Sequence, residues 1–137
     1  MDTHPAGVEV FIYTWTKLFG NSEYSLRLPF VLAGIFSVLL IFWIVRIWFN
    51  PSSALFAALI MSFLSYPILY SQLARPYSFG FLFVLMAVWF WTKIFIDLKK
   101  EKIRHYAGFA FFIALSAYTH YFSFFFVMIV GLSGFLF

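Results

Sequence analysis

The sequence predicts an all-α fold, a polytopic bundle of transmembrane helices. Three observations support this prediction: 64% of the 137 residues are hydrophobic, 10% are charged, and long apolar segments alternate with short polar turns. A chain with so little polar surface cannot cover a water-soluble domain. The 22 Phe, 8 Tyr and 5 Trp would also overfill the interior of a small domain, so lipid must form part of the solvent.

We interpret residues 1–25 as an external loop that contains a short interfacial helix. The segment from Val8 to Phe19 mixes apolar residues with charged residues and threonines, which is typical of a helix on the membrane surface. Gly20 predicts the end of this helix, and Ser22 predicts the N-cap of the next one.

Five apolar segments follow, and we interpret each as a transmembrane segment, since about 20 apolar residues cross the hydrocarbon core of a bilayer. They are residues 26–49, 53–70, 77–96, 105–118 and 122–137. Pro67 predicts a kink in the second segment or its exit from the membrane. The last segment stops inside an apolar run without a polar anchor, so we expect an incomplete bundle from a longer protein.

The positions of the basic residues predict how the bundle is oriented. Six lie near one set of segment ends (Arg46, Lys93, Lys99, Lys100, Lys102 and Arg104), and three lie near the other set (Lys17, Arg27 and Arg75). By the positive-inside rule the first set is cytoplasmic. The loop before the first segment, the turn from Gln72 to Pro76 and the turn at Thr119 and His120 then share the non-cytoplasmic side. Membrane topology therefore explains the net charge of +4, and we expect no nucleic-acid partner.

Carboxylates, imidazoles and hydroxyls are the candidate reactive groups, because a chain without cysteine has no thiol nucleophile and no thiolate metal site. Asp2 and His4 place a carboxylate and an imidazole two positions apart in a loop. Together they could reach a metal, a phosphate-bound cation or a sugar hydroxyl. An ordinary solvated loop has the same composition, so the spacing leaves both interpretations open.

Two polar turns carry further candidates. Arg75 lies at a segment boundary, where a guanidinium could fork onto the phosphate of an anionic partner or extend to lipid headgroups. His120 lies between two apolar segments and is either a ligand or phosphate partner, or a hydrogen-bonded histidine in an aromatic belt. Glu23 and Arg27 are four residues apart, and we expect them to form an ordinary helical ion pair.

Four motifs in this order resemble one family. They are Asp2-x-His4-Pro5, Phe19-Gly20-x-Ser22-Glu23-x-x-x-Arg27-Leu28-Pro29, Tyr70-Ser71-Gln72-x-Ala74-Arg75-Pro76-Tyr77 and Tyr118-Thr119-His120-Tyr121-Phe122. With them the chain is similar to glycosyltransferase family 39, the dolichyl-phosphate-mannose-protein mannosyltransferase-like group. The chain departs from the family pattern at Ala6, where a second proline is common, and at Leu73, where glutamate is common.

The resemblance implies a multi-pass membrane glycosyltransferase of the C-type superfold. Such an enzyme, a hexosyl or pentosyl transferase, takes a sugar from a polyprenyl-phosphate-linked donor and gives it to a lipid, glycan or protein hydroxyl. Transfer takes place on the non-cytoplasmic side of the cell membrane. The family's main catalytic acid is expected upstream of this chain, so we expect the isolated fragment to be inactive.

The resemblance also implies roles for particular residues. Arg75 would contact the donor phosphate, and Asp2 would act in catalysis or, with His4, as a ligand of a divalent metal, the one cofactor that we consider. The other expected substrate contacts are His4, Gln72, Tyr77 and His120.

A transporter or channel fragment is the alternative interpretation, with the polar turns lining a substrate path. Two features favour the transferase. The polar residues lie at the boundaries of the apolar segments instead of at their midpoints, and no pair of Gly- or Pro-broken segments repeats.

Overall fold

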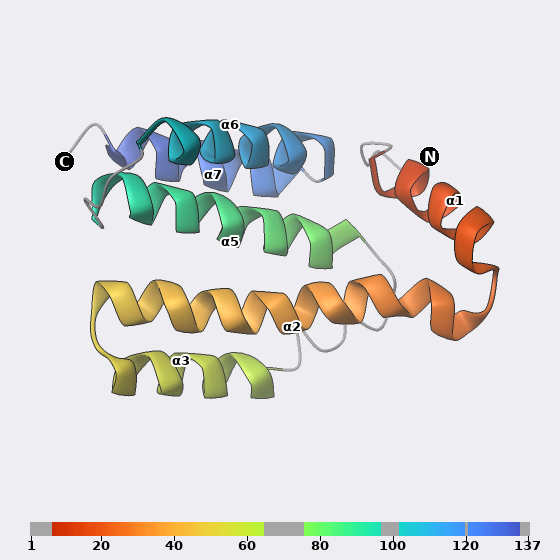
Figure 1. The fold of residues 1–137 in the computed structure, drawn as a ribbon, viewed down its shortest axis with the longest axis horizontal. Helices are drawn as coiled ribbons and strands as arrows, with labels where there is room; N and C mark the ends of the chain where they lie inside the picture. The colour runs from red at the N-terminus through yellow and green to blue at the C-terminus, as the bar shows by residue number, and fades with distance from the viewer. Residues whose placement is uncertain (1–6, 65–75, 97–101, 120, 135–137) are drawn as a thin grey trace.

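The computed structural model describes residues 7–64, 76–96, 102–119 and 121–134, and nearly all of these residues are helical (Figure 1). The helices are α1 (Gly7–Phe19), α2 (Glu23–Trp48), α3 (Pro51–Phe63), α5 (Pro76–Phe95), α6 (Lys102–Thr119) and α7 (Tyr121–Ser133). No strand occurs within these ranges, and the predicted all-α fold is confirmed.

Gly20 and Ser22 separate α1 from α2, as the sequence predicts. Gly20 has a φ of 81°, and its N–H donates to the Thr16 carbonyl oxygen at 2.9 Å, which ends α1 in a conformation that glycine adopts without strain. The Ser22 hydroxyl accepts a hydrogen bond from the Ser25 N–H at 3.2 Å and caps α2. The helix therefore begins at Glu23, before the expected apolar segment.

Pro29 lies buried inside α2 and ties this helix to α1. A proline has no N–H, so the carbonyl of Ser25, four residues earlier, lacks its helical donor. The Trp15 indole N–H of α1 donates to that carbonyl oxygen at 2.9 Å. The backbone acceptor that Pro29 leaves unused thus forms the contact that fixes α1 against α2.

Two of the described helices are long and apolar enough to cross a membrane, namely α2 and the Tyr77–Phe95 part of α5. The 26 residues of α2 rise by about 39 Å, more than the hydrocarbon thickness of about 30 Å. α3 and α7 have 13 residues each within the described ranges, which is short for a span. Pro67 lies outside the described residues, and the five expected transmembrane boundaries stay predictions.

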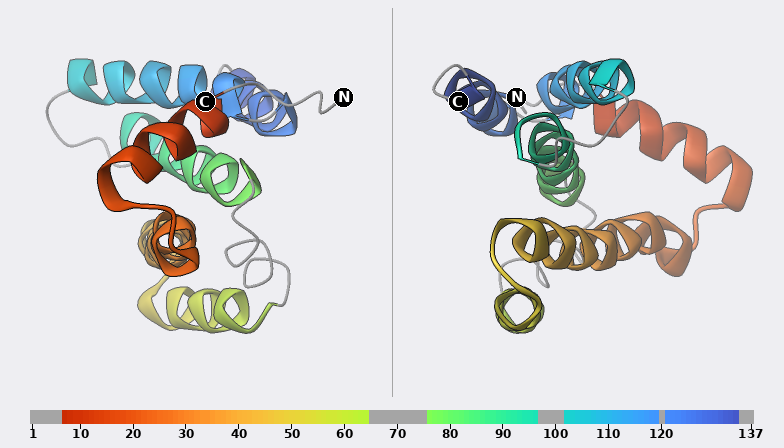
Figure 2. Two further views of the ribbon diagram at one scale, coloured as in Figure 1. Left: turned by 90° about the vertical axis from the view of Figure 1, so that its right-hand side faces the viewer. Right: turned by 60° about the vertical axis from the view of Figure 1, so that its left-hand side comes forward.

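α2 and α5 run parallel at the centre of the molecule. Phe30 of α2 contacts Phe79 of α5 near their N-termini, with ring centroids 4.9 Å apart. Near their C-termini the Trp48 indole N–H donates to the Thr92 hydroxyl at 2.9 Å. Figure 2 shows α3, α2 and α5 stacked in turn, with α6 and α7 side by side beyond α5.

The described helices bury a small core and expose a large apolar surface. Val84 and Ala87 of α5 and Val127 of α7 form the buried cluster, and aromatic residues of α6 pack around it. By contrast, Phe56 and Phe63 of α3 are 67% and 82% exposed. Apolar surface of this extent suits contact with lipid.

Candidate functional site

One end of the bundle brings together the starts of α1, α5 and α7 and the end of α6 (Figures 1 and 2). Phe11 of α1 packs edge-on against Phe79 of α5, with ring centroids 5.1 Å apart. A Cβ added to Gly7 would lie 2.6 Å from the Tyr118 carbonyl oxygen of α6, so glycine permits this close backbone approach. We refer to this end as the motif end.

The site residues that the sequence predicts are close in sequence to the helix ends that form the motif end. Tyr77 is the one predicted site residue that lies within the described ranges; it occupies the first turn of α5 and is half-buried. The other predicted residues lie outside the described residues, and their roles are not tested: Asp2, His4, Gln72, Arg75 and His120. Their described neighbours Gly7, Tyr77, Thr119 and Tyr121 all belong to helix ends at this end of the bundle.

Ser78 is a polar residue of the motif end that sequence reasoning missed. Its side chain is buried at 8% exposure, and its hydroxyl has no hydrogen-bond partner among the described residues. A buried hydroxyl without a partner costs free energy unless a ligand or water satisfies it. The sequence shows a serine directly after Pro76 and Tyr77, but nothing in the local pattern indicates that this serine is buried.

Arg27 also lies near the motif end but is already paired. Its guanidinium lies 2.5 Å from the Glu23 carboxylate, four residues earlier on α2, and both side chains are exposed. The predicted helical ion pair is therefore confirmed. An exposed pair of this kind contributes little to stability, and the carboxylate reduces the attraction of Arg27 for a phosphate.

The opposite end of the bundle is basic and aromatic. Arg46 and Lys93 lie near the C-termini of α2 and α5, and Arg104 lies in the first turn of α6. These three cations thus lie where the sequence predicts the cytoplasmic side, whereas Lys17 of α1 and Arg27 of α2 lie toward the other end. We refer to this end as the basic end.

The part of the chain that the structure describes contains no group of three or more His, Asp or Glu residues able to hold a metal ion. The two predicted metal ligands, Asp2 and His4, lie before the first described residue. Their role as ligands stays a prediction.

The chain was compared with models of known protein families. The model of the family described as dolichyl-phosphate-mannose-protein mannosyltransferase matches residues 3–137. No curated protein and no solved structure matches the chain. The family match contains all four sequence motifs except for Asp2, which lies just before it.

Proposed function

Because the chain belongs to the dolichyl-phosphate-mannose-protein mannosyltransferase family of membrane glycosyltransferases, we propose that it serves in sugar transfer from a polyprenyl-phosphate-linked donor. The acceptor is a hydroxyl of a lipid, glycan or protein, and transfer takes place on the non-cytoplasmic side. The observation that carries this proposal is the family match, which covers nearly the whole chain.

The chemistry of this reaction assigns distinct tasks to the polar residues. The acceptor hydroxyl loses a proton and attacks the anomeric carbon of the sugar, the bond from that carbon to the phosphate oxygen breaks, and the lipid phosphate leaves. A carboxylate such as Asp2 can receive the proton. A guanidinium such as Arg75 can stabilise the negative charge that develops on the leaving phosphate.

Other residues would hold the donor and the acceptor in position relative to each other. We assign Gln72, Tyr77 and His120 to hydrogen bonds with the sugar or the phosphate, and His4 to the acceptor or a metal. Tyr77 supports this assignment because it lies at the motif end, where α1 and α6 approach each other through Gly7 and the Tyr118 carbonyl. A site assembled from several helix ends fixes the reacting groups relative to one another, which is a main source of catalytic rate.

The arrangement of apolar helices suits a lipid-linked donor. Exposed aromatic side chains surround the motif end: Tyr118 is 72% exposed and Tyr121 57% exposed. Tyrosines at such positions have an apolar body for acyl or prenyl chains and a hydroxyl for the aqueous boundary. The polyprenyl chain of the donor could therefore lie in the bilayer beside these helices while its phosphate reaches the boundary.

Replacing Arg75 by Ala in the full-length protein tests the assignment of the phosphate contact. We expect the affinity for the polyprenyl-phosphate sugar donor to fall by about tenfold to a hundredfold, because a charge-assisted hydrogen bond contributes about 1.5–3 kcal/mol. Donor binding would be measured on the purified protein in detergent micelles, with the Kd compared between variants.

The matched control is Arg27→Ala, which removes an arginine near the motif end that is paired with Glu23. We expect its Kd for the donor to equal that of the unmodified protein. An Arg75→Ala variant that folds and keeps its donor affinity would exclude Arg75 as the phosphate contact.

A further inference from the structure

Helix α1 lies across the motif end of the bundle, from the end of α6 to the start of α2 (Figure 2). Contacts to α6, α5 and α2 hold it there, namely Gly7 with the Tyr118 carbonyl, Phe11 with Phe79, and Trp15 with the Ser25 carbonyl. We propose that α1 is a lid, which opens and closes over the start of α5 by rotation about Gly20. The service of this lid in sugar transfer rests on the proposed function, whereas its motion does not.

The packing of α1 is light for a helix of 13 residues. Val8 is its one buried residue, and Val10, Tyr13 and Leu18 are all exposed. By comparison, the neighbouring α5 has buried residues along its whole length. A helix with so few buried apolar contacts separates from its neighbours at a small cost in free energy.

The hydrogen bond of Trp15 can open and close without damage to α2. The Ser25 carbonyl accepts from the Trp15 indole at 2.9 Å because Pro29 has no N–H to offer to it. When α1 moves away, water at the membrane boundary can replace the indole as the donor, and the helical hydrogen bonds of α2 stay in place. The bond therefore holds the lid closed but is not part of the helix against which it closes.

Gly20 and Asn21 form a suitable pivot between the two helices. Gly20 has a φ of 81°, and a Cβ built there would have no described atom within 4 Å apart from its chain neighbours. The hydrogen bond from Gly20 to Thr16 ends α1, and Ser22 caps α2, so both helices keep their structure up to the pivot. Short segments at the ends of helices, such as this one, are where proteins absorb the changes in φ and ψ of a hinge.

The side of α1 that contacts the bundle carries a row of aromatic rings. Phe11, Trp15 and Phe19 stack in turn, with ring centroids 5.8 and 4.2 Å apart. Phe11 also packs edge-on against Phe79 of α5, two residues after Tyr77. In the closed position this row excludes water from the surroundings of Tyr77, which limits hydrolysis of the donor and strengthens electrostatic interactions there.

Electron paramagnetic resonance on the full-length protein tests the motion. In a protein whose other cysteines are replaced, spin labels are attached to Val10→Cys in α1 and Ile35→Cys in α2, both at exposed positions. Val10 lies about 15 Å from Gly20 along the helix, so a rotation of about 30° moves it by about 8 Å. We expect Trp15→Phe to raise the population of the open distance by about fivefold, the effect of losing one neutral hydrogen bond.

The variant Trp48→Phe is the matched control. It also removes an indole hydrogen bond of 2.9 Å, from Trp48 to the Thr92 hydroxyl, but this bond lies at the basic end. The labels on Val10→Cys and Ile35→Cys should therefore show the same distances as in the unmodified protein.

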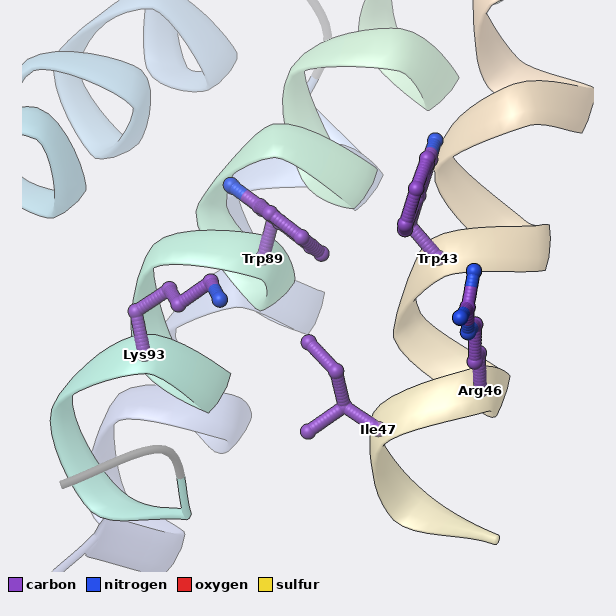
Figure 3. Close-up of a pocket in the computed structure, with 5 residues that line it drawn as sticks. All are labelled: Trp43, Arg46, Ile47, Trp89 and Lys93. Atoms are coloured by element: carbon purple, nitrogen blue, oxygen red, sulfur yellow. The ribbon is translucent and has the colours of Figure 1, made fainter. Parts of the chain in front are cut away.

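A second pair of labels separates motion of the lid from loosening of the whole bundle. At the basic end the C-terminal parts of α2 and α5 enclose a hollow of about 550 Å³, with Trp43 of α2 and Trp89 of α5 among its lining residues (Figure 3). Labels on Trp43→Cys and Trp89→Cys have room in this hollow and report the separation of the two helices. Trp15→Phe should leave the dipolar broadening of this pair unchanged.

Two results would overturn the proposal. One is a Trp15→Phe variant whose distances from α1 to α2 equal those of the unmodified protein. The other is a comparable change in both label pairs, which would mean that the bundle loosens as a whole.

The donor provides the link to sugar transfer. Addition of dolichyl-phosphate mannose to Trp15→Phe should return the labels on α1 and α2 to the closed distance, because the closed lid covers a bound donor. A lid that moves but does not respond to this donor would contradict its service in sugar transfer, while the motion itself would stand.

Discussion

Pro29 removes one backbone donor from α2, and Trp15 supplies the replacement. Replacing Trp15 by Phe would keep an aromatic ring between Phe11 and Phe19, whose centroids lie 5.8 and 4.2 Å from that of Trp15, but would leave the Ser25 carbonyl without its donor. We expect the free energy of unfolding to fall by about 1 kcal/mol, the usual cost of an unsatisfied acceptor that is partly buried.

The same substitution in a Pro29→Ala background supplies the control. Alanine restores an N–H at position 29, which can donate to the Ser25 carbonyl within α2. Trp15→Phe should then cost less than about 0.5 kcal/mol, and the double-mutant cycle should give a positive coupling energy. Unfolding in mixed detergent micelles, followed by circular dichroism, measures all four proteins. A Trp15→Phe cost that is equal in both backgrounds would contradict this role of Pro29.

Gly20 and Gly7 show which roles of a single residue can be predicted from the sequence and which cannot. Gly20 is predictable as a helix terminator because the signal is local: a glycine followed by a capping serine. Gly7 is not, because the reason for a glycine there lies on α6, more than a hundred positions away along the chain. Ser78 is missed for the same reason, since its burial depends on how neighbouring helices pack around α5.

At the scale of helices, the close contact between α1 and α6 predicts a specific effect of Gly7→Ala. The new methyl group would meet the Tyr118 carbonyl oxygen at 2.6 Å, and because that oxygen belongs to the backbone it cannot rotate away. α1 must therefore move from α6. Because a displacement of about 1 Å in a reacting group can lower the rate a hundredfold, we expect a tenfold or greater loss of sugar transfer by the full-length enzyme.

Gly131→Ala is the matched control for this displacement. A Cβ at Gly131 would lie 3.6 Å from the Phe109 ring, an ordinary van der Waals contact, and alanine favours the helix. Transfer activity should stay close to that of the unmodified enzyme. Equal activity of the Gly7 and Gly131 variants would mean that the approach of α1 to α6 does not position the reacting groups.

The sequence predicts where helices occur better than it predicts which helices pack against each other. An apolar run marks where a helix can meet lipid, but helical hydrogen bonding extends past it, so α2 and α6 begin before residues 26 and 105. The parallel pairing of α2 with α5 could not be predicted, because a helix that is apolar on every face has no stripe that identifies its partner. The pairing rests on contacts between residues that are far apart in the sequence, namely Trp48 with Thr92 and Phe30 with Phe79.

At the scale of the whole molecule, the two ends of the bundle differ in chemistry. The motif end combines tyrosines, the buried Ser78 hydroxyl and the close approach at Gly7, whereas the basic end combines Arg46 and Lys93 with tryptophans. If the basic end faces the cytoplasm, α2 crosses the membrane once and places the motif end on the opposite side. The proposed use of a donor on the non-cytoplasmic side depends on this orientation.

Single cysteines can test the orientation directly, because this chain has none of its own. Asn21 lies between α1 and α2, Ser52 lies in the first turn of α3, and both are exposed, with α2 between them. In a full-length protein whose other cysteines are replaced, a membrane-impermeant maleimide should label Asn21→Cys from the non-cytoplasmic side only. It should label Ser52→Cys only after the membrane is permeabilised. Labelling of both from one side would show that α2 does not cross the bilayer. Reversed labelling would place the motif end in the cytoplasm, and the proposed side of sugar transfer would be wrong even though the family assignment would stand.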